Sequence, residues 1–322
     1  MDVSIIIVNY RSAQMVIDCV HSVFDNTTGL KYEIIIVDNA SGDDSVEKLE
    51  ETFGRKITVI SSPQNLGFGK ANNLGAKKAA GQYLFLLNPD TLIIDNSILL
   101  LYKYIKDCKK IGVVGGNLYS PDMKPLPSYC MEFDGLDTEK KKASWKEIIR
   151  AKIRQKLDNK LKKGTVQFNQ EFNYSNEPKQ VAYIFGADMM MKKSLFEELQ
   201  GFDPDFFMYC EEEELSWRIT EKGYSIMNLP ESKIIHLEGA TLKNKDEFSE
   251  RQFRMRMNGT LTYFWKRYGL EGAEQFYKLR SLRYDRLIKI AKWQRKLTDT
   301  FVPMVQKRCL DEVYQEFMEQ RK

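Results

Sequence analysis

The chain has few of the residues on which many metal sites and secreted folds depend. It has only two histidines, His21 and His236, which excludes a histidine-rich zinc site. Its five cysteines are odd in number and lack metal-type spacing, so they fit a reducing compartment as small buried hydrophobes. No apolar run approaches the roughly 20 residues of a membrane-spanning helix. No basic segment precedes the first strand, so we expect a cytoplasmic protein without a signal peptide.

The composition is that of a soluble globular chain. Its 322 residues are 43% hydrophobic and 29% charged, which is enough for one large domain or one domain with an appendage. The net charge of +4 is unevenly spread. Residues 138–163 and 278–308 are rich in Lys and Arg, whereas residues 197–214 are acidic. This unevenness separates two basic helical regions from the rest of the chain.

Short apolar strands alternate with helical patterns through the first half of the chain. The pattern predicts buried strands at 3–8, 33–37, 57–60 and 83–87, and helices at 12–25, 43–53, 70–80 and 98–105. Such alternation is typical of an α/β protein with a mainly parallel sheet and helices on both faces. A strand at 113–119 would continue this sheet.

The pattern changes after residue 120. Turn-rich sequence is followed by further elements: a basic helix at 144–161, sheet patterning at 181–191, helices at 195–199 and 211–222, and strands at 224–227 and 233–236. From about residue 241 the sequence is helical and basic. We therefore predict one α/β domain over 1–240, with a basic helical insertion around 134–165, and a basic helical C-terminal region over 241–322.

Asn88-Pro89-Asp90 directly follows the apolar run at 82–87, so Asp90 stands at the carboxyl end of a buried strand. Open α/β sheets bind their ligands at that end. Mg²⁺ and Mn²⁺ are held by few protein carboxylates and completed by water and diphosphate oxygens, so an oxygen ligand placed there suits them. The same tripeptide is also ordinary turn chemistry, and by itself it does not decide between the two.

Polar residues also end the first two predicted strands. Val8-Asn9-Tyr10 ends the first, and Val37-Asp38-Asn39-Ala40-Ser41 ends the second. If these strands are neighbours, their polar ends converge on one crevice. There Asp38 could accept a hydrogen bond from a base N–H or a ribose hydroxyl, and Asn9 could position the nucleotide. The alternative for Asp38 is a capping or Asx-turn residue before the next helix.

The segment 65–73, NLGFGKANN, is predicted to be a loop that enters a helix. Gly67 and Gly69 let the backbone approach a ligand closely, and the helix N-terminus favours anionic phosphate. A dinucleotide fingerprint would place a third glycine at position 72, which is Asn. The turn after the first strand has no glycine either, and NAD binding is therefore excluded.

Four consecutive glutamates, residues 211–214, open a predicted helix. Negative charge at a helix N-terminus is stabilising, which explains some of them. Adjacent carboxylates also repel one another and so raise the pKa of a neighbour, which suits a general base that works near neutral pH. His236 ends an apolar strand and is either a core histidine or a metal ligand.

Together these segments resemble an inverting family 2 glycosyltransferase of the GT-A fold, with most similarity to its rhamnosyltransferase-like branch. The resemblance is carried in the family's order by VSIIIVNY, EIIIVDNASGD, NLGFGKANNLGAKKAAGQYLFLLNPDT, FGADMMMKKSLFEELQGFDPDFFMYCEEEELSWRITEKGY and the closing IIH. One such segment is common, but five in this order and spacing are highly specific. The resemblance covers residue 3 to about 240 and implies a Rossmann-like GT-A domain with a C-terminal helical extension.

The resemblance implies a role for each matching position. Nucleotide contacts fall on Val8, Asn9, Tyr10, Asp38, Asn39, Asn65, Gly67, Asn72 and Asn88. Asp90 takes the place of the last acid of the family's Asp-X-Asp motif and would hold Mg²⁺ or Mn²⁺, with His236 as a further metal contact. Gly186 and Ala187 would line the acceptor side.

The catalytic base departs from the family pattern. The family's base is normally the Asp of a Glu-Asp pair, whereas Glu212 stands here after Glu211 and is one methylene longer. The base therefore remains open among Glu211, Glu212 and Glu213, with Glu212 favoured by the alignment. The first acid of Asp-X-Asp is also replaced, by Asn88, so a single carboxylate would carry the metal.

The reaction implied is transfer of a hexosyl or rhamnosyl group from a nucleotide-diphosphate sugar, a UDP- or dTDP-sugar, to a glycan or lipid-linked saccharide in surface polysaccharide synthesis. A sugar nucleotidyltransferase is an alternative with a similar sheet and metal requirement. It would need a glycine-rich basic loop directly after the first strand, which Tyr10-Arg11-Ser12 does not supply.

The basic helices at 144–161 and around 282–297 admit three interpretations. They pack on the catalytic core with a solvated face, or they attach the protein to the anionic inner face of a membrane as a peripheral protein. The latter suits a lipid-linked acceptor, and it also admits a non-catalytic membrane-surface binding protein. Nucleic-acid binding is disfavoured because no recognised motif accompanies the charge.

Overall fold

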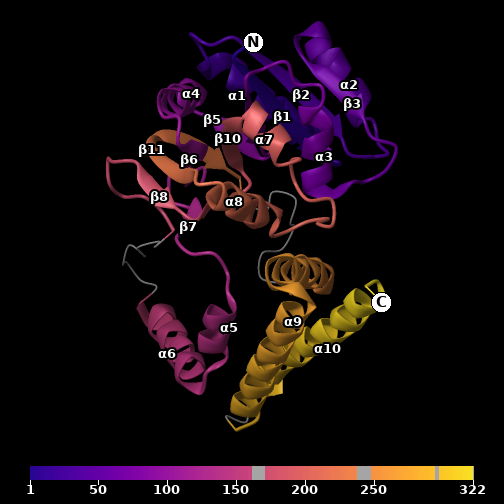
Figure 1. The fold of residues 1–322 in the computed structure, drawn as a ribbon, viewed down its shortest axis with the longest axis vertical. Coiled ribbons are helices and arrows are strands. Elements are labelled where there is room, and N and C mark those ends of the chain that lie inside the picture. The colour runs from indigo at the N-terminus through magenta and orange to yellow at the C-terminus, as the bar shows by residue number, and fades with distance from the viewer. Residues whose placement is uncertain (162–170, 238–247, 294–296, 322) are drawn as a thin grey trace. The chain divides into compact units, whose positions relative to one another are not determined.

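The computed structural model describes residues 1–161, 171–237, 248–293 and 297–321, with the backbone alone described at 154–161 and 297–300. The chain divides into two compact units (Figure 1). Unit 1 comprises residues 1–133, 169–207 and 211–245, and unit 2 comprises residues 134–168, 208–210 and 246–322. The boundary predicted near residue 240 and the end of the insertion predicted near 165 lie outside the described residues.

Unit 1 is built around a mixed sheet. Its strands run in the order β3 (Thr58–Ser61), β2 (Tyr32–Asp38), β1 (Val3–Asn9), β4 (Tyr83–Leu87), β10 (Asp188–Lys192), β6 (Ile111–Tyr119), β11 (Ser225–His236) and β5 (Thr91–Ile93), and β8 (Lys179–Val181) pairs with β11. The first four strands pair in parallel, as expected from their apolar runs and intervening helices. β10 enters antiparallel between β4 and β6.

Helices cover both faces of this sheet. Residues of α1 (Ala13–Asn26), α2 (Ser45–Phe53) and α4 (Ser97–Asp107) share a core cluster with Ile5 and Ile7 of β1. Residues of α3 (Gly67–Ala76), α7 (Lys193–Glu198) and α8 (Glu211–Glu221) share the opposite cluster with Ile6. Neighbouring strand residues point to opposite faces, so a strand covered on both sides needs an unbroken apolar run.

Several elements had no clear sequence pattern and were not predicted. β5 and β7 (Tyr129–Cys130), which pairs with β9 (Tyr183–Ile184) in a two-stranded sheet, are too short for periodicity to show. The patterning at 181–191 divides among β8, β9 and β10. The two strands predicted at 224–227 and 233–236 form the single β11, whose register shifts between Asn228 and Lys233. A bulge of this kind interrupts the alternation that sequence patterns detect.

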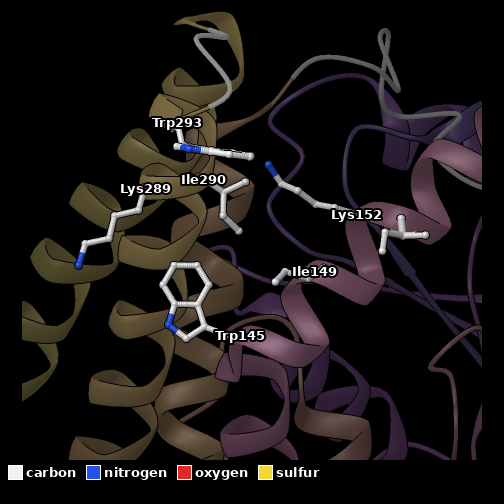
Figure 2. A pocket seen from close by; sticks show the side chains of 7 residues that line it. Trp145, Ile149, Lys152, Lys289, Ile290 and Trp293 are labelled. Atoms are coloured by element: carbon white, nitrogen blue, oxygen red, sulfur yellow. The ribbon is translucent and has the colours of Figure 1, made fainter.

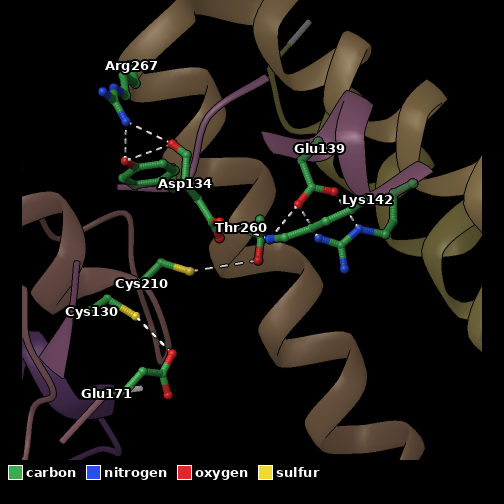
Figure 3. A network of polar contacts seen from close by, with 10 residues as sticks. Cys130, Asp134, Glu139, Lys142, Glu171, Cys210, Thr260 and Arg267 are labelled. Carbon is green, nitrogen blue, oxygen red and sulfur yellow. Dashed lines mark hydrogen bonds and ion pairs between the residues drawn. The ribbon is translucent and has the colours of Figure 1, made fainter. Parts of the chain in front are cut away.

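Unit 2 is helical. It contains α5 (Leu136–Ala143), α6 (Trp145–Leu161), α9 (Glu250–Trp293) and α10 (Leu297–Glu319), and α9 kinks at Gly269. Glu139 of α5 is buried and accepts two hydrogen bonds of 2.9 Å from Arg280 of α9, while Lys142 approaches it to 3.0 Å (Figure 3). Figure 3 also shows Arg267 donating to the Asp134 carbonyl, at 2.8 Å. Among the described helices of the whole chain, none combines the length and the apolar character needed to cross a bilayer.

Candidate functional site

The register of the parallel strands brings the predicted site residues to one end of the sheet. Asn9 pairs with Asp38 at the ends of β1 and β2, and Ile7 pairs with Leu87 at the end of β4. The backbone N–H of Asn88 then donates to the Ala187 carbonyl at 2.9 Å, just before β10 begins. The nucleotide and acceptor positions predicted from sequence therefore leave the sheet at the same edge, where α/β folds bind ligands.

Asp38 is held in a tight polar network. Its Oδ1 accepts from Asn9 Nδ2 at 2.8 Å and from Ser41 Oγ at 2.5 Å, and its Oδ2 accepts from the Ser41 N–H at 3.2 Å. Only 5% of the residue is exposed. Asp38 does not cap α2, whose N-cap is Asp44, but its hydrogen bonds to Ser41 order the loop after β2, as the Asx-turn alternative predicts. The sequence analysis placed Ser41 at this strand end but gave it no role. Beside this network, Val8 is half-buried and Tyr10 is exposed.

A second network joins the end of β2 to the start of α3. Asn39 Nδ2 donates to Asn65 Oδ1 at 3.1 Å, and Asn39 Oδ1 accepts from the Leu66 N–H at 2.7 Å. Asn65 Oδ1 also accepts from the Gly67 N–H at 2.9 Å. Asn72 lies one turn into α3, 1% exposed, and donates to the Phe68 carbonyl. These side-chain amides order the loop at the start of α3, where the sequence predicts that a loop enters a helix.

The reason given for the two glycines needs correction. A Cβ at Gly67 would lie 1.9 Å from the Phe207 carbonyl oxygen, and a Cβ at Gly69 would lie 2.8 Å from the Phe202 Cβ. The Phe68 N–H donates to the same Phe207 carbonyl at 3.0 Å. The close approach that these glycines permit is therefore to the segment at 202–207, rather than to a ligand.

Asp90, which directly precedes β5, meets His236 at the end of β11. His236 Nε2 lies 3.3 Å from Asp90 Oδ1, and the Leu237 N–H donates to the Asp90 carbonyl at 2.8 Å. A carboxylate and an imidazole at this distance can ligate one ion, and two protein ligands leave positions for water and diphosphate oxygens. No cluster of three or more His, Cys, Asp or Glu that could enclose a metal occurs among the described residues. The pair fits a metal shared with its substrate better than a permanent structural ion.

The four glutamates at the start of α8 have different surroundings. Glu214 forms an ion pair with Arg218, whose guanidinium also donates to the Leu199 and Gly201 carbonyls. Burial, and after it the charge of Glu213, raises the pKa of Tyr183. Glu213 and Glu214 are both buried, and Glu214 is held by Arg218.

Glu211 and Glu212 have surroundings that suit proton transfer. Burial raises the pKa of Glu211 well above its usual value, and the neighbouring charge of Glu212 adds to this rise. Burial also raises the pKa of Glu212. A Cβ at Gly186 would lie 4.0 Å from the Glu212 carboxyl carbon and 3.5 Å from the Phe68 ring. Glu212 is thus the glutamate that lies beside the predicted acceptor residues, and Phe68 is a neighbour that the sequence analysis missed.

The backbone just before these glutamates is strained. Tyr209 and Cys210 have φ angles of 76° and 68°, in the left-handed region that residues other than glycine rarely adopt. Two such residues in succession are unusual, and strained backbone concentrates at functional sites.

Asp188 is a buried acid that the sequence analysis did not single out. It lies at the start of β10, fully buried, and its Oδ2 accepts from the Gly116 N–H at 2.5 Å. Burial raises the pKa of Asp188 well above 3.8. Its position next to Ala187, inside the FGADMMM segment, is the sequence feature from which a role for Asp188 near the site could have been predicted.

Comparison with protein families shows the family to which the chain belongs. The model of the family described as "Glycosyl transferase family 2" matches residues 4–199. The chain is a member of this family. The match spans the strands that carry Asn9, Asp38 and Asp90.

The chain is about a quarter identical to several curated proteins over the aligned residues. Glycosyltransferase GlyG of Streptococcus pneumoniae serotype 4 is 28% identical over 122 residues, which cover 37% of this chain and 40% of GlyG. Rhamnosyltransferase WbbL of Escherichia coli K12 is 25% identical over 211 residues, covering 61% and 69%. The N-acetylglucosaminyl-diphospho-decaprenol L-rhamnosyltransferase of Mycobacterium tuberculosis is 23% identical, covering 63% and 66%. The chain is thus similar to two proteins named as rhamnosyltransferases, which agrees with the resemblance that its motifs carry.

Solved structures establish the fold. GalNAc-T7, crystallised with UDP, GalNAc and Mn²⁺, aligns with a TM-score of 0.57 at 21% identity over 74% of this chain and 45% of its own. The mannosyltransferase PcManGT of Pyrobaculum calidifontis, crystallised with GDP-Man and Mn²⁺, aligns at 0.56 and 13% identity over 99% and 88%. The predicted GT-A fold is confirmed.

Proposed function

We propose that this family 2 member is an inverting, metal-dependent glycosyltransferase, with residues 1–240 as its catalytic domain. The observation that carries the proposal is the meeting, at one sheet edge, of the Asp90–His236 pair with the segment at 186–187, beside which Glu212 lies. Inverting transfer needs groups for a leaving diphosphate and a base for the attacking hydroxyl.

The donor is a nucleotide-diphosphate sugar, with a UDP- or dTDP-sugar as the first candidates. The titles of the structural neighbours name UDP and GDP-Man, which supports this class of donor. Asn9 and Asp38 would bind the base and ribose, together with the amides of Asn39 and Asn65. Asp38 already accepts three hydrogen bonds, so a ribose hydroxyl would have to share or replace one of them.

Asp90 and His236 would hold Mg²⁺ or Mn²⁺, and the metal, when bound, would neutralise charge on the leaving diphosphate. The neighbours crystallised with Mn²⁺ support this role. The 3.3 Å distance between Asp90 Oδ1 and His236 Nε2 allows both side chains to face one ion without rearrangement of β11. Asn88, which replaces the first acid of the family motif, keeps its backbone N–H on Ala187 and so holds the metal loop against the acceptor segment.

Glu212 would take the proton of the acceptor hydroxyl as its oxygen attacks the anomeric carbon. Burial raises the pKa of Glu212, which makes its carboxylate a stronger base at neutral pH. Gly186 carries no side chain, which leaves room beside the carboxylate for a sugar hydroxyl, and Phe68 supplies an apolar wall.

The acceptor is a glycan or a lipid-linked saccharide, and the transferred group is hexosyl or rhamnosyl. Two relatives are named as rhamnosyltransferases, and the name of one contains a saccharide joined by diphosphate to a decaprenol lipid. A lipid-linked acceptor suits surface polysaccharide synthesis at the cytoplasmic face of a membrane.

Product analysis tests the reaction. We would incubate the protein with Mn²⁺ and a panel of UDP-, dTDP- and GDP-sugars, with a lipid extract as the acceptor source. Release of nucleoside diphosphate together with a glycosylated lipid is the expected result. Release of pyrophosphate in a parallel assay with nucleoside triphosphates and sugar 1-phosphates would instead identify a nucleotidyltransferase. The absence of product in both assays would contradict the enzymatic proposal.

A further inference from the structure

A groove with a volume of about 480 Å³ lies between α6 and α9 of unit 2 (Figure 2). Its apolar walls are Trp145, Ile149, Ile153, Ile290 and Trp293. Figure 2 shows the Trp145 and Ile149 side chains on one helix facing the space beside Ile290 and Trp293 on the other. None of these residues takes part in the glycosyl-transfer site described above.

The apolar side of α6 faces outward. Trp145, Ile149 and Ile153 are 42%, 49% and 53% exposed, whereas Ile148 is 3% exposed. Trp293 at the end of α9 is 84% exposed. A helix that only packs on a core buries its apolar stripe and exposes its charges. The stripe over 145–153 does the reverse, so core packing does not explain it.

The charge around the groove is almost entirely positive. Lys152 and Lys289 line it directly. The two stretches that flank it, 145–153 and 286–293, contain six cations and one carboxylate, Glu147. Glu147 lies 3.6 Å from Arg150 and is thereby partly neutralised. Two copies of this surface would repel each other, whereas an anionic surface would be attracted.

We propose that the α6–α9 groove docks the protein on an anionic lipid bilayer. Trp145 and Trp293 would enter the headgroup region, where indole rings find an apolar and a polar environment at once. Ile149 and Ile153 would bury between them, and Lys152 and Lys289 would reach lipid phosphates with their long side chains. The helices thereby act as an interfacial anchor and do not span the membrane. This surface deepens the proposed function, since a lipid-linked saccharide acceptor lies in such a membrane.

Vesicle co-sedimentation of the full chain, without donor or metal, tests the docking. The vesicles contain phosphatidylglycerol and phosphatidylcholine in a roughly one-to-two ratio, against phosphatidylcholine alone. Binding to the anionic vesicles only, weakened by added salt, is the expected result. The double variant Trp145→Ala/Trp293→Ala should lower the partition coefficient by about tenfold or more, because it removes the two largest inserted side chains. Vesicles should also blue-shift the tryptophan emission of the wild type and not of this variant.

Matched variants distinguish vesicle binding by the groove from nonspecific vesicle binding elsewhere on the protein. Leu282→Ala removes another exposed apolar side chain of α9, and Lys109→Glu/Lys110→Glu reverses two exposed cations of unit 1. Both should bind vesicles like the wild type, whereas Lys152→Glu/Lys289→Glu should lose binding. Equal binding by Trp145→Ala/Trp293→Ala and the wild type would overturn the proposal. So would a groove-dependent dimer in light scattering with no vesicle binding, since a second copy would then be the occupant.

Measurement of nucleotide binding tests the docking surface separately from the proposed function. The thermal shift caused by a nucleotide-sugar and Mn²⁺ should be the same in Trp145→Ala/Trp293→Ala as in the wild type. If Trp145→Ala/Trp293→Ala loses vesicle binding but keeps the thermal shift, the substitutions impair docking alone. Vesicle binding without any nucleotide response would support the docking surface and contradict the glycosyltransferase.

Discussion

At the scale of single residues, environment separates four glutamates that the sequence presents as equals. Glu214 is committed to Arg218, and Glu213 lies close enough to influence Tyr183. Glu212 lies beside Gly186, and the neighbouring Glu211 is deeply buried with its Oε2 unpaired. The alignment favoured Glu212 as the base, and this geometry supports that prediction on independent grounds.

Glu212→Gln should lower turnover by roughly 10²–10⁴-fold, because the amide cannot accept the acceptor proton. The donor KM and the nucleotide-induced thermal shift should change little, since the carboxylate is not assigned to nucleotide binding. Initial rates of nucleoside diphosphate release measure the effect. Glu221→Gln at the exposed end of α8 serves as the control and should keep the wild-type rate. Turnover near the wild-type rate in Glu212→Gln would move the base to Glu211.

Asp188 should make stability fall as pH rises. Burial raises the pKa of Asp188 well above 3.8, so the folded protein keeps a proton that the unfolded chain releases above about pH 4. Its contribution to the free energy of unfolding is therefore complete below that pH and is lost as the pH rises through the folded pKa. Asp188→Asn removes this titration, so the variant should gain stability relative to the wild type as the pH rises above about 4.

Urea unfolding at several pH values measures that difference. Asp107→Asn, at the exposed end of α4, is the matched control and should give a profile parallel to the wild type. A difference between Asp188→Asn and the wild type that stays constant with pH would show that Asp188 carries no extra proton in the folded state.

At the scale of secondary-structure elements, Gly67 joins the entry of α3 to the 202–207 segment. Its φ is +77° and a Cβ would lie 1.9 Å from the Phe207 carbonyl oxygen. Gly223 has a similar φ of +84° but nothing within 4 Å of its Cβ position. Gly223→Ala should therefore cost about 1–2 kcal/mol for backbone strain alone. Gly67→Ala should cost at least about 1 kcal/mol more, because the segment must also move.

Denaturant titration of both variants compares these two costs. A similar loss in Gly67→Ala and Gly223→Ala would show that the 202–207 segment yields easily. Gly67→Ala should also weaken nucleotide binding, because Gly67 and Asn65 share the hydrogen-bond network that orders the loop after β3.

The same elements show how far sequence reasoning reaches. β1, β2 and β4 were predictable because strands covered on both faces need unbroken apolar runs. The antiparallel entry of β10 was not, since a Met-rich run carries no information about strand direction. Within the site, the strand-end residues Asn9, Asp38 and Asp90 followed from topology, whereas Ser41 and Phe68 act through contacts that only the folded chain creates. The exposure of the apolar residues of α6 could not be predicted either, because helical periodicity identifies an apolar face but not whether another element covers it.

At the scale of the whole molecule, the GT-A likeness extends beyond the motifs that carry family membership. The family model ends at residue 199, yet Glu212 and His236 lie beyond it. Both belong to unit 1, because α8 and β11 pack on the strands that the family model covers. Residues 134–161, in contrast, lie in the same compact unit as the C-terminal helices. The chain is therefore divided into an α/β unit and a helical unit, each assembled from several separate stretches of the sequence.

Metal and nucleotide should stabilise the folded protein together. A ligand present at about 100 times its Kd adds about 2.7 kcal/mol to the free energy of unfolding, which raises the Tm by several degrees. We expect one nucleoside diphosphate of a UDP, dTDP and GDP panel to do this only with Mn²⁺, and chelation to reverse it. Asp90→Asn should lose the Mn²⁺-dependent part, because His236 alone holds the ion weakly, and Asp107→Asn should retain it. An equal shift in Asp90→Asn and the wild type would mean that Asp90 belongs to the turn and not to the metal.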